Sequence, residues 1–191
     1  QVYYHKTVLA VEYMLISILN RARALALSEV DLPAPAALKF FLYRKIGKEE
    51  FLSSADSLAT FAALDDYDLF SALKDWCRHS DPVLSFLCES LLNRKLFRVV
   101  ITTEPFGEEK LDQIRSKIVL KLKLSGTDYT YFTGQGEISN SAYDPNKDRI
   151  TMVDKNGERF DISGLSEQLN IAIYNKTVSK YFTYFPKWAD I

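Results

Sequence analysis

The feature that most constrains the fold is a long apolar repeat near the N-terminus. Between residues 2 and 27, apolar side chains recur at alternating spacings of three and four. The repeat consists of Val8, Val11, Leu15, Ile18, Ala22 and Leu25, and it is widened by Leu9, Ile16 and Leu19. This spacing predicts one continuous helix with a broad apolar face, against which more than one element packs. Arg21 and Arg23 lie in its last turns, where positive charge suits the helix dipole.

Proline and aspartate then mark three further helices. Pro33 and Pro35 force a break, after which residues 36–46 form a short helix ended by Gly47. The pair Asp65-Asp66 can cap a third helix, and Asp81-Pro82 starts a fourth with a capping carboxylate and a proline at the first helical position. The side chains expected to face inward are Tyr67, Phe70, Leu73, Trp76, Cys77, Leu84, Leu87, Cys88, Leu91 and Leu92.

The pattern changes after Asn93, where β-branched and alternating stretches begin. Strands are expected at residues 96–103, 118–124, 129–133, 150–153 and 159–162, and short helices at 108–116 and 163–169. The Asn156-Gly157 pair favours a tight hairpin, and Gly134-Gln135-Gly136 indicates a flexible hairpin tip. The predicted fold class is α+β: a helical segment over 1–94 followed by a small mixed α/β subdomain over 95–191.

Composition excludes several classes of protein. The 191 residues include 24 Lys and Arg against 25 Asp and Glu, which argues against a strongly basic nucleic-acid binder. No apolar run is long enough to span a bilayer. Cys77 and Cys88 are too few for a disulfide framework and fit a reducing, cytoplasmic location. The chain opens without an initiator Met or signal peptide, and we expect it to be a piece of a longer protein.

The familiar catalytic motifs are missing from the chain. The two histidines, His5 and His79, could join a metal site only with carboxylates that the sequence does not identify. There is no phosphate-binding P-loop and no Gly-x-Ser-x-Gly elbow, and Ser139 stands where a dinucleotide loop would need its third glycine. We therefore expect no self-contained catalytic or metal site in this chain.

Several segments nevertheless resemble a known family. Tyr3-Tyr4-His5-Lys6-Thr7 followed by Val11-Glu12-Tyr13-Met14-Leu15 resembles the helix after the catalytic centre of HD-domain phosphohydrolases, and among them of the deoxynucleoside-triphosphate triphosphohydrolases. Residues 65–82, 93–98 and 180–187 are similar to the same family in order and spacing. The resemblance covers nearly the whole chain but is weak between about 105 and 170.

The resemblance implies a function for the parent protein. In that family the histidine and aspartate metal ligands precede the matching segments, so the chain is expected to be the C-terminal regulatory and oligomerisation part, inactive by itself. The parent would be a metal-dependent hydrolase that converts dNTPs to deoxynucleosides and triphosphate, and its divalent metal could be Mn, Mg, Fe or Zn. A nucleotide substrate, an effector nucleotide and a homo-oligomeric state, dimer or tetramer, are the implied partners. The alternative is a non-catalytic assembly module, whose apolar face over residues 8–25 is a packing surface.

The same resemblance implies roles for individual residues. Tyr3 and Tyr4 would line the substrate pocket, or would simply pack as two aromatics at the helix start. The residues implied in effector binding are His5, Lys6, Arg94, Arg98 and Lys176. Guanidinium groups bind phosphate oxygens bidentately and a lysine supplies a point charge, which suits a triphosphate. The alternatives are a capping or packed His5 and a solvated helix end at Arg94 and Arg98. Surface carboxylates exposed to solvent are expected at Glu104, Asp128 and Asp161.

Overall fold

The computed structural model describes residues 5–140, 151–161 and 178–190, and its fold is α+β as predicted. The helices are α1 (Lys6–Leu27), α2 (Ala36–Leu42), α3 (Lys48–Ser53), α4 (Ala55–Ala63), α5 (Asp66–Trp76), α6 (Pro82–Leu92), α7 (Glu108–Leu122), η1 (Asp128–Tyr131) and η3 (Lys187–Ala189). The strands are β1 (Arg98–Thr102), β2 (Gly134–Asn140), β3 (Thr151–Val153), β4 (Arg159–Asp161) and β5 (Val178–Phe185). No helix in these three ranges is both long enough and apolar enough to cross a bilayer.

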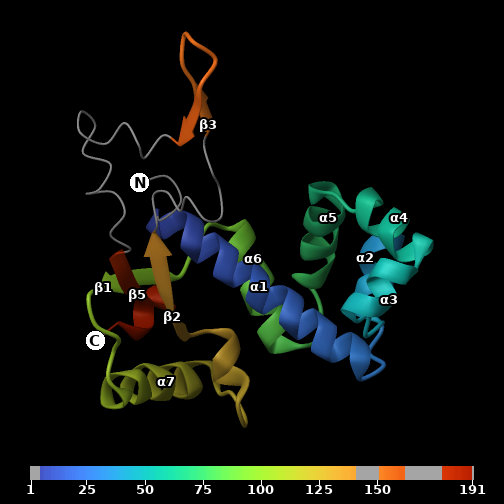
Figure 1. Ribbon diagram of the computed structural model, residues 1–191. Helices are drawn as coiled ribbons and strands as arrows, with labels where there is room; N and C mark the ends of the chain where they lie inside the picture. The colour runs from blue at the N-terminus through green and yellow to red at the C-terminus, as the bar shows by residue number, and fades with distance from the viewer. Residues whose placement is uncertain (1–4, 141–150, 162–177, 191) are drawn as a thin grey trace. The chain divides into compact units, whose positions relative to one another are not determined.

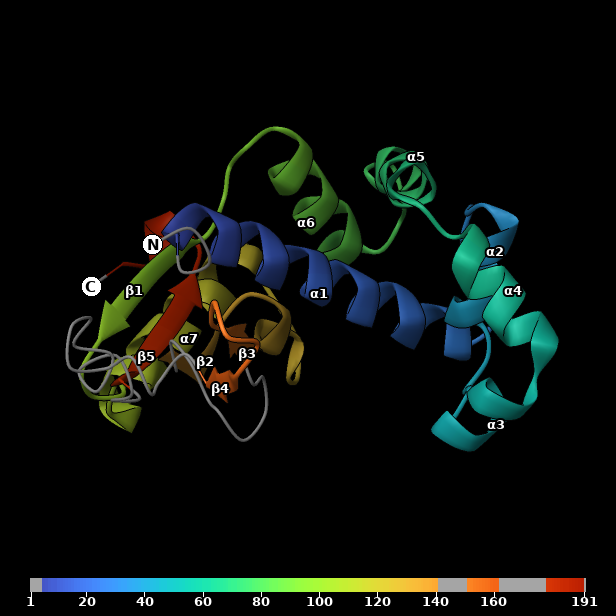
Figure 2. The same ribbon diagram turned by 45° about the horizontal axis from the view of Figure 1, so that its top comes forward.

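The described residues divide into two compact units. One consists of residues 5–100, 106–134 and 183–190, and the other of 101–105, 135–140, 151–161 and 178–182. In the first unit α6 packs along α1, and α2, α3 and α4 gather at the C-terminal end of α1 (Figure 1, Figure 2). Strands β1, β5 and β2 form a sheet in that order.

The predicted long helix is present as α1, but its buried face differs from the predicted one. The buried residues are Leu9, Ala10, Met14, Ser17, Ile18, Ala22 and Ala26. Val8, Val11 and Ile16 are 50%, 38% and 43% exposed, so these three predicted core positions are wrong. The buried face includes the small side chains of Ala10, Ser17, Ala22 and Ala26, and a count of strongly apolar residues alone does not detect them.

Both aspartate-capped helices are confirmed. Asp65 accepts from the backbone N–H groups of Tyr67 and Asp68 at the start of α5, and Asp81 accepts from Leu84 N at 2.7 Å at the start of α6. Tyr67 and Phe70, predicted to face inward, are 84% and 53% exposed. The burial of α5 is concentrated in its C-terminal half, where Ala72, Leu73 and Trp76 are covered. The exposed N-terminal half explains the two errors.

The second predicted helix is too long, because α2 ends at Leu42 rather than near Gly47. The guanidinium of Arg23 donates to the carbonyl oxygens of Phe41 at 3.2 Å and Arg44 at 3.0 Å, and so holds the chain as it leaves α2. Arg23 therefore binds carbonyls of another segment, and the expected role of Arg21 and Arg23 at the end of α1 is wrong, since the last turn of α1 holds no basic residue. Helices α3 and α4 were not predicted.

Two predicted strands are helical. Residues 118–122 belong to α7, because Leu111, Ile114 and Ile118 are buried at helical spacing and the apparent alternation also satisfies that period. Residues 129–133 largely form η1. The segment Gly134–Gly136 is no hairpin tip and begins β2 instead. Gly134 is required there because an added Cβ would lie 2.6 Å from Oη of Tyr184.

The predicted hairpin is confirmed as β3 and β4, which pair antiparallel with Thr151 opposite Asp161 and Val153 opposite Arg159. Its turn uses Gly157 with φ of 86°, a left-handed backbone that favours glycine. The predicted strand over 96–103 is confirmed as β1. The predicted helix over 163–169 lies outside the described residues.

Candidate anion-binding site

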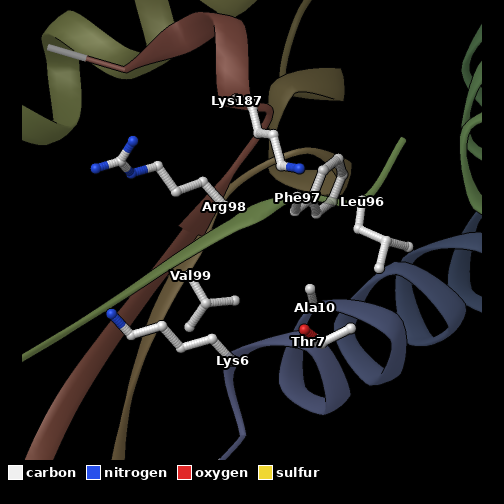
Figure 3. Close-up of a pocket in the computed structure, with 8 residues that line it drawn as sticks. All are labelled: Lys6, Thr7, Ala10, Leu96, Phe97, Arg98, Val99 and Lys187. Carbon is white, nitrogen blue, oxygen red and sulfur yellow. The ribbon is translucent and has the colours of Figure 1, made fainter. Parts of the chain in front are cut away.

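A pocket of about 370 Å³ lies where the first turn of α1, the start of β1 and η3 meet. Figure 3 shows the side chains that line it: Lys6, Thr7, Ala10, Leu96, Phe97, Arg98, Val99 and Lys187. Each element brings a cation, because α1 begins with Lys6, β1 begins with Arg98, and η3 begins with Lys187 directly after Pro186. Buried Phe97 and Val99 anchor the strand beneath these exposed cations.

The charged residues that line this pocket are all cations. None of the described residues that line it is acidic. The side-chain ammonium groups of Lys6 and Lys187 form no hydrogen bond or ion pair with any residue that the structure describes. Arg98 also forms an ion pair with Asp190, with 2.6 Å between Nη1 and Oδ2, and its guanidinium has further N–H donors on Nε and Nη2. A pocket lined by three cations and no acidic residue among those described is suited to an anion with several oxygen atoms.

A second pocket of about 500 Å³ adjoins the first, since both are lined by Leu96, Phe97 and Lys187. It adds two cations, Arg94 and Lys95. Its other walls are Phe86, Glu89, Ser90, Pro186 and Trp188. Lys187 therefore lies on the boundary of two basic pockets, and an extended anion could contact cations in both.

The backbone at Arg94 explains how the end of α6 presents its side chain. Arg94 N donates to Leu91 O at 3.1 Å and Lys95 N donates to Ser90 O at 2.8 Å, the hydrogen-bond pattern of a Schellman motif. This motif places Arg94 in the left-handed region, with φ of 56°. The chain turns sharply there, and both Arg94 and Lys95 end on the rim of the second pocket.

The structure brings together some of the residues singled out in the sequence. Lys6 and Arg98 line one pocket, and Arg94 lines the adjoining pocket rather than the same one. His5 caps α1, because its Nδ1 accepts from Thr7 N at 3.3 Å, and it is not among the residues lining either pocket. Tyr3, Tyr4 and Lys176 lie outside the described residues.

Lys187 is the residue that sequence reasoning missed. It belongs to the segment 180–187 that carries part of the family resemblance, but nothing in its neighbourhood along the chain connects it with Lys6 or Arg98. Only the return of the chain along β5 brings it beside β1. The sequence predicts no strand over the residues of β5, so no signal connects Lys187 with Lys6 and Arg98.

A separate, partly buried ion cluster holds α1, α6 and η1 together. Arg21 binds both carboxylate oxygens of Asp81, with Nε–Oδ1 at 3.1 Å and Nη2–Oδ2 at 2.6 Å, and contacts Asp128 with Nη1–Oδ1 at 3.0 Å. Its guanidinium also lies 5.2 Å from the ring centroid of Tyr131. The expectation that Asp128 is a solvated surface carboxylate is therefore wrong.

This cluster shifts the protonation equilibria of its members. Burial by itself would raise the pKa of Asp81, but the hydrogen bonds from Arg21 and from Leu84 N outweigh it and hold that pKa below its usual value. The hydrogen bond to Asp81 correspondingly raises the pKa of Arg21. Both groups stay charged at neutral pH, and their pairing is consistent with a structural role.

The chain offers no set of ligands for a catalytic metal among its described residues. Within them, no three His, Cys, Asp or Glu side chains lie close enough together to hold an ion. Both cysteines are free thiols, and burial raises the pKa of the Cys88 thiol, which keeps it protonated and a poor metal ligand. No step through a metal is therefore assigned to these residues.

The fold and the two basic pockets define an α+β chain with a candidate site for a polyvalent anion. Comparison with solved structures finds a likeness to the crystal structure of a phosphohydrolase from Bacteroides thetaiotaomicron VPI-5482, with 40% sequence identity and a TM-score of 0.85. The match covers 96% of this chain and 45% of that chain, so this chain spans less than half the length of its neighbour. No family model and no curated protein matches the sequence. The likeness fits a phosphohydrolase family.

Proposed function

We propose that this chain is the C-terminal regulatory and oligomerisation part of a metal-dependent HD-family phosphohydrolase. The 40% identity to a phosphohydrolase supports the hydrolase class. The observation that carries the regulatory role is that Lys6, Arg98 and Lys187 all line one pocket that has no acidic residue among its described lining. The parent would hydrolyse dNTPs to deoxynucleosides and triphosphate, and it would act as a dimer or tetramer.

The two adjoining pockets suggest how an effector triphosphate would bind. Arg98 would donate a bidentate pair to one phosphate group, since Asp190 occupies a single nitrogen. Lys187, on the boundary of the pockets, and Lys6 would neutralise the neighbouring phosphates as point charges. Arg94 would contact the far end of the chain of phosphates. Substrate contacts would come from Tyr3 and Tyr4, and the metal would be held by other parts of the parent.

The test uses the full-length parent protein with Mn²⁺ or Mg²⁺ and each dNTP, with and without a second nucleotide. Ion-exchange chromatography should detect intact triphosphate as the product. Release of pyrophosphate, or no turnover of any nucleotide, would contradict the dNTPase assignment and leave the chain as an assembly module.

The regulatory site is tested separately by substitution. Lys187→Gln and Arg98→Gln should each raise the effector concentration for half-maximal activation about tenfold, the scale of one lost charged hydrogen bond. Lys74→Gln is the matched control, because Lys74 is an exposed lysine of α5 that does not line these pockets. An unchanged effector dependence in the first two variants would remove the regulatory role from this site.

One observation favours the alternative function, an assembly module. A largely apolar groove of about 710 Å³ runs between α1, α5 and α6 and is lined by Val11, Leu15, Leu69, Phe70, Leu73, Leu91, Leu92 and Leu96, among others. Val11 and Phe70 are 38% and 53% exposed, and apolar patches of this kind mark interaction surfaces. Val11→Ser with Phe70→Ser should then reduce self-association in sedimentation velocity while nucleotide affinity stays unchanged.

A further inference from the structure

A third pocket, of about 330 Å³, lies at the other end of α1, where α2, α3 and α4 gather (Figure 1, Figure 2). Its lining combines two kinds of side chain, three phenylalanine rings and three cations. These are Phe41, Phe51, Phe61, Arg23, Arg44 and Lys48. None of the described residues that line it is acidic, and Glu49 and Glu50 of α3 are not among them.

The rings form a connected aromatic wall. Phe61 meets Phe41 edge-to-face, with ring centroids 6.1 Å apart and an interplanar angle of 90°. It meets Phe51 in the same way at 5.6 Å and 85°. Phe61 nevertheless remains 56% exposed, although burying the apolar surface of a phenylalanine ring is favourable. The wall therefore offers a ring surface on which a planar ligand can stack.

The cations divide into one that builds the pocket and two that are available to a ligand. Arg23 is engaged with the carbonyl oxygens of Phe41 and Arg44 and so fixes the segment between α2 and α3. The guanidinium of Arg44 lies 4.2 Å from the ring centroid of Phe40, which leaves its in-plane N–H donors open. The ammonium group of Lys48 is exposed and forms no hydrogen bond or ion pair with the described residues.

We propose that this pocket binds a planar aromatic base joined through a sugar to a phosphate group, the chemical class of the nucleoside monophosphates. The ring stacks on Phe61, and the phosphate accepts from the guanidinium of Arg44 and from the ammonium group of Lys48. The volume of about 330 Å³ lies at the lower end of small-molecule sites and suits one base with one phosphate better than a longer chain of phosphates. This site shares no lining residue with the basic pockets near β1.

The test is calorimetric titration of AMP into the chain carrying Lys6→Gln, Arg98→Gln and Lys187→Gln, so that binding near β1 is weakened. AMP should bind at least about tenfold more tightly than adenosine or inorganic phosphate, because each of these probes satisfies only half of the site. Arg44→Gln and Lys48→Gln should each weaken AMP binding about tenfold, and Phe61→Ala should do so by losing the stacking surface.

Lys45→Gln is the matched control, since Lys45 is an exposed neighbour of Arg44 that does not line the pocket. The proposal is overturned if AMP does not bind at millimolar concentration, if inorganic phosphate binds as tightly as AMP, or if Lys45→Gln has the same effect as Arg44→Gln. Far-UV circular dichroism of each variant confirms that it folds. Effector activation of the parent depends on Lys187 and Arg98, so the proposed function and this site can fail independently.

Discussion

Asp81 has two roles that substitution can separate. Its Oδ1 accepts from Leu84 N at 2.7 Å and caps α6, and its two oxygens also bind the guanidinium of Arg21. Asp81→Ala removes both interactions, whereas Asp81→Ser keeps a capping oxygen and removes the ion pair. The side chain of Asp81 is only 10% exposed, so water replaces the lost partner poorly.

The magnitude follows from these two interactions. Loss of the cap costs about 1 kcal/mol. Loss of the paired hydrogen bonds to a charged, partly buried Arg21 costs about 2 kcal/mol, because Arg21 retains Asp128 at 3.0 Å. We therefore expect Asp81→Ala to lower the free energy of unfolding by about 3 kcal/mol and Asp81→Ser by about 2 kcal/mol.

The assay is urea unfolding followed by far-UV circular dichroism, with Asp65 as the reference position. Asp65 caps α5 and forms a capping box with Asp68, but it forms no ion pair with any residue that the structure describes. Asp65→Ala should therefore cost about 1 kcal/mol and Asp65→Ser close to nothing. If Asp81→Ala costs no more than Asp65→Ala, the ion pair with Arg21 contributes nothing and the reasoning is refuted. A double-mutant cycle with Arg21→Met measures the coupling directly.

Three further outcomes follow from single contacts. The pKa of Asp81 is lower in the folded protein than in the unfolded chain, so its contribution to stability is complete above about pH 4 to 5 and is lost as the pH falls through the folded pKa. In Asp81→Asn, the midpoint of urea unfolding should therefore depend less on pH in that acidic window. Gly134→Ala should destabilise the chain by about 2 kcal/mol in urea unfolding, since the new Cβ meets the ring of Tyr184 at 2.6–2.8 Å, and an unchanged midpoint would contradict this contact. Trp76→Phe should cost about 2 kcal/mol in the same assay, because the Trp76 side chain is buried and its Nε1 donates to Pro33 O at 2.9 Å; a loss well below 1 kcal/mol would show that water satisfies that carbonyl.

The parts of the fold that the sequence predicts correctly are those that local chemistry determines. Asp65 and Asp81 supply the acceptors that a helix start needs, and each is followed by a helix. The Asn156-Gly157 turn likewise joins β3 to β4. In each case the determining residues lie within a few positions of the structure that they produce, so a short stretch of sequence carries the information.

The errors arise where packing decides between two patterns. The stretch from Ile118 to Leu124 alternates like a strand, but Ile118 also continues a helical series with Leu111 and Ile114, and burial of that series selects the helix. Tyr67 has an apolar ring at an inward spacing and is still 84% exposed, because the burial of α5 is concentrated in its C-terminal half. No local rule shows which neighbours an element will have.

The residues of the candidate site also include some that the sequence identifies and others that only long-range packing brings together. Lys6 and Arg98 were singled out by resemblance to a family, and the structure places them in one pocket. Lys187 carries no local signal, because its relation to them depends on the position of β5 in the sheet. The pairing of Arg21 with Asp128 is also a long-range contact, and for that reason Asp128 could not be distinguished from a solvated carboxylate.

The backbone at Arg94 gives a final test of the regulatory site. Three described residues other than glycine have positive φ: Glu29 at 63°, Arg94 at 56° and Lys123 at 52°, and each lies at the end of a helix. Since the conformation recurs at Glu29 and Lys123, which line none of the pockets described above, left-handed backbone at Arg94 is not by itself a sign of function. Replacement by glycine should therefore stabilise the chain by about 1 kcal/mol at all three positions. Only Arg94→Gly should also weaken binding of a triphosphate, measured by calorimetry, because only that side chain borders the basic pockets; equal weakening by Lys123→Gly would mean that net charge rather than the site binds the anion.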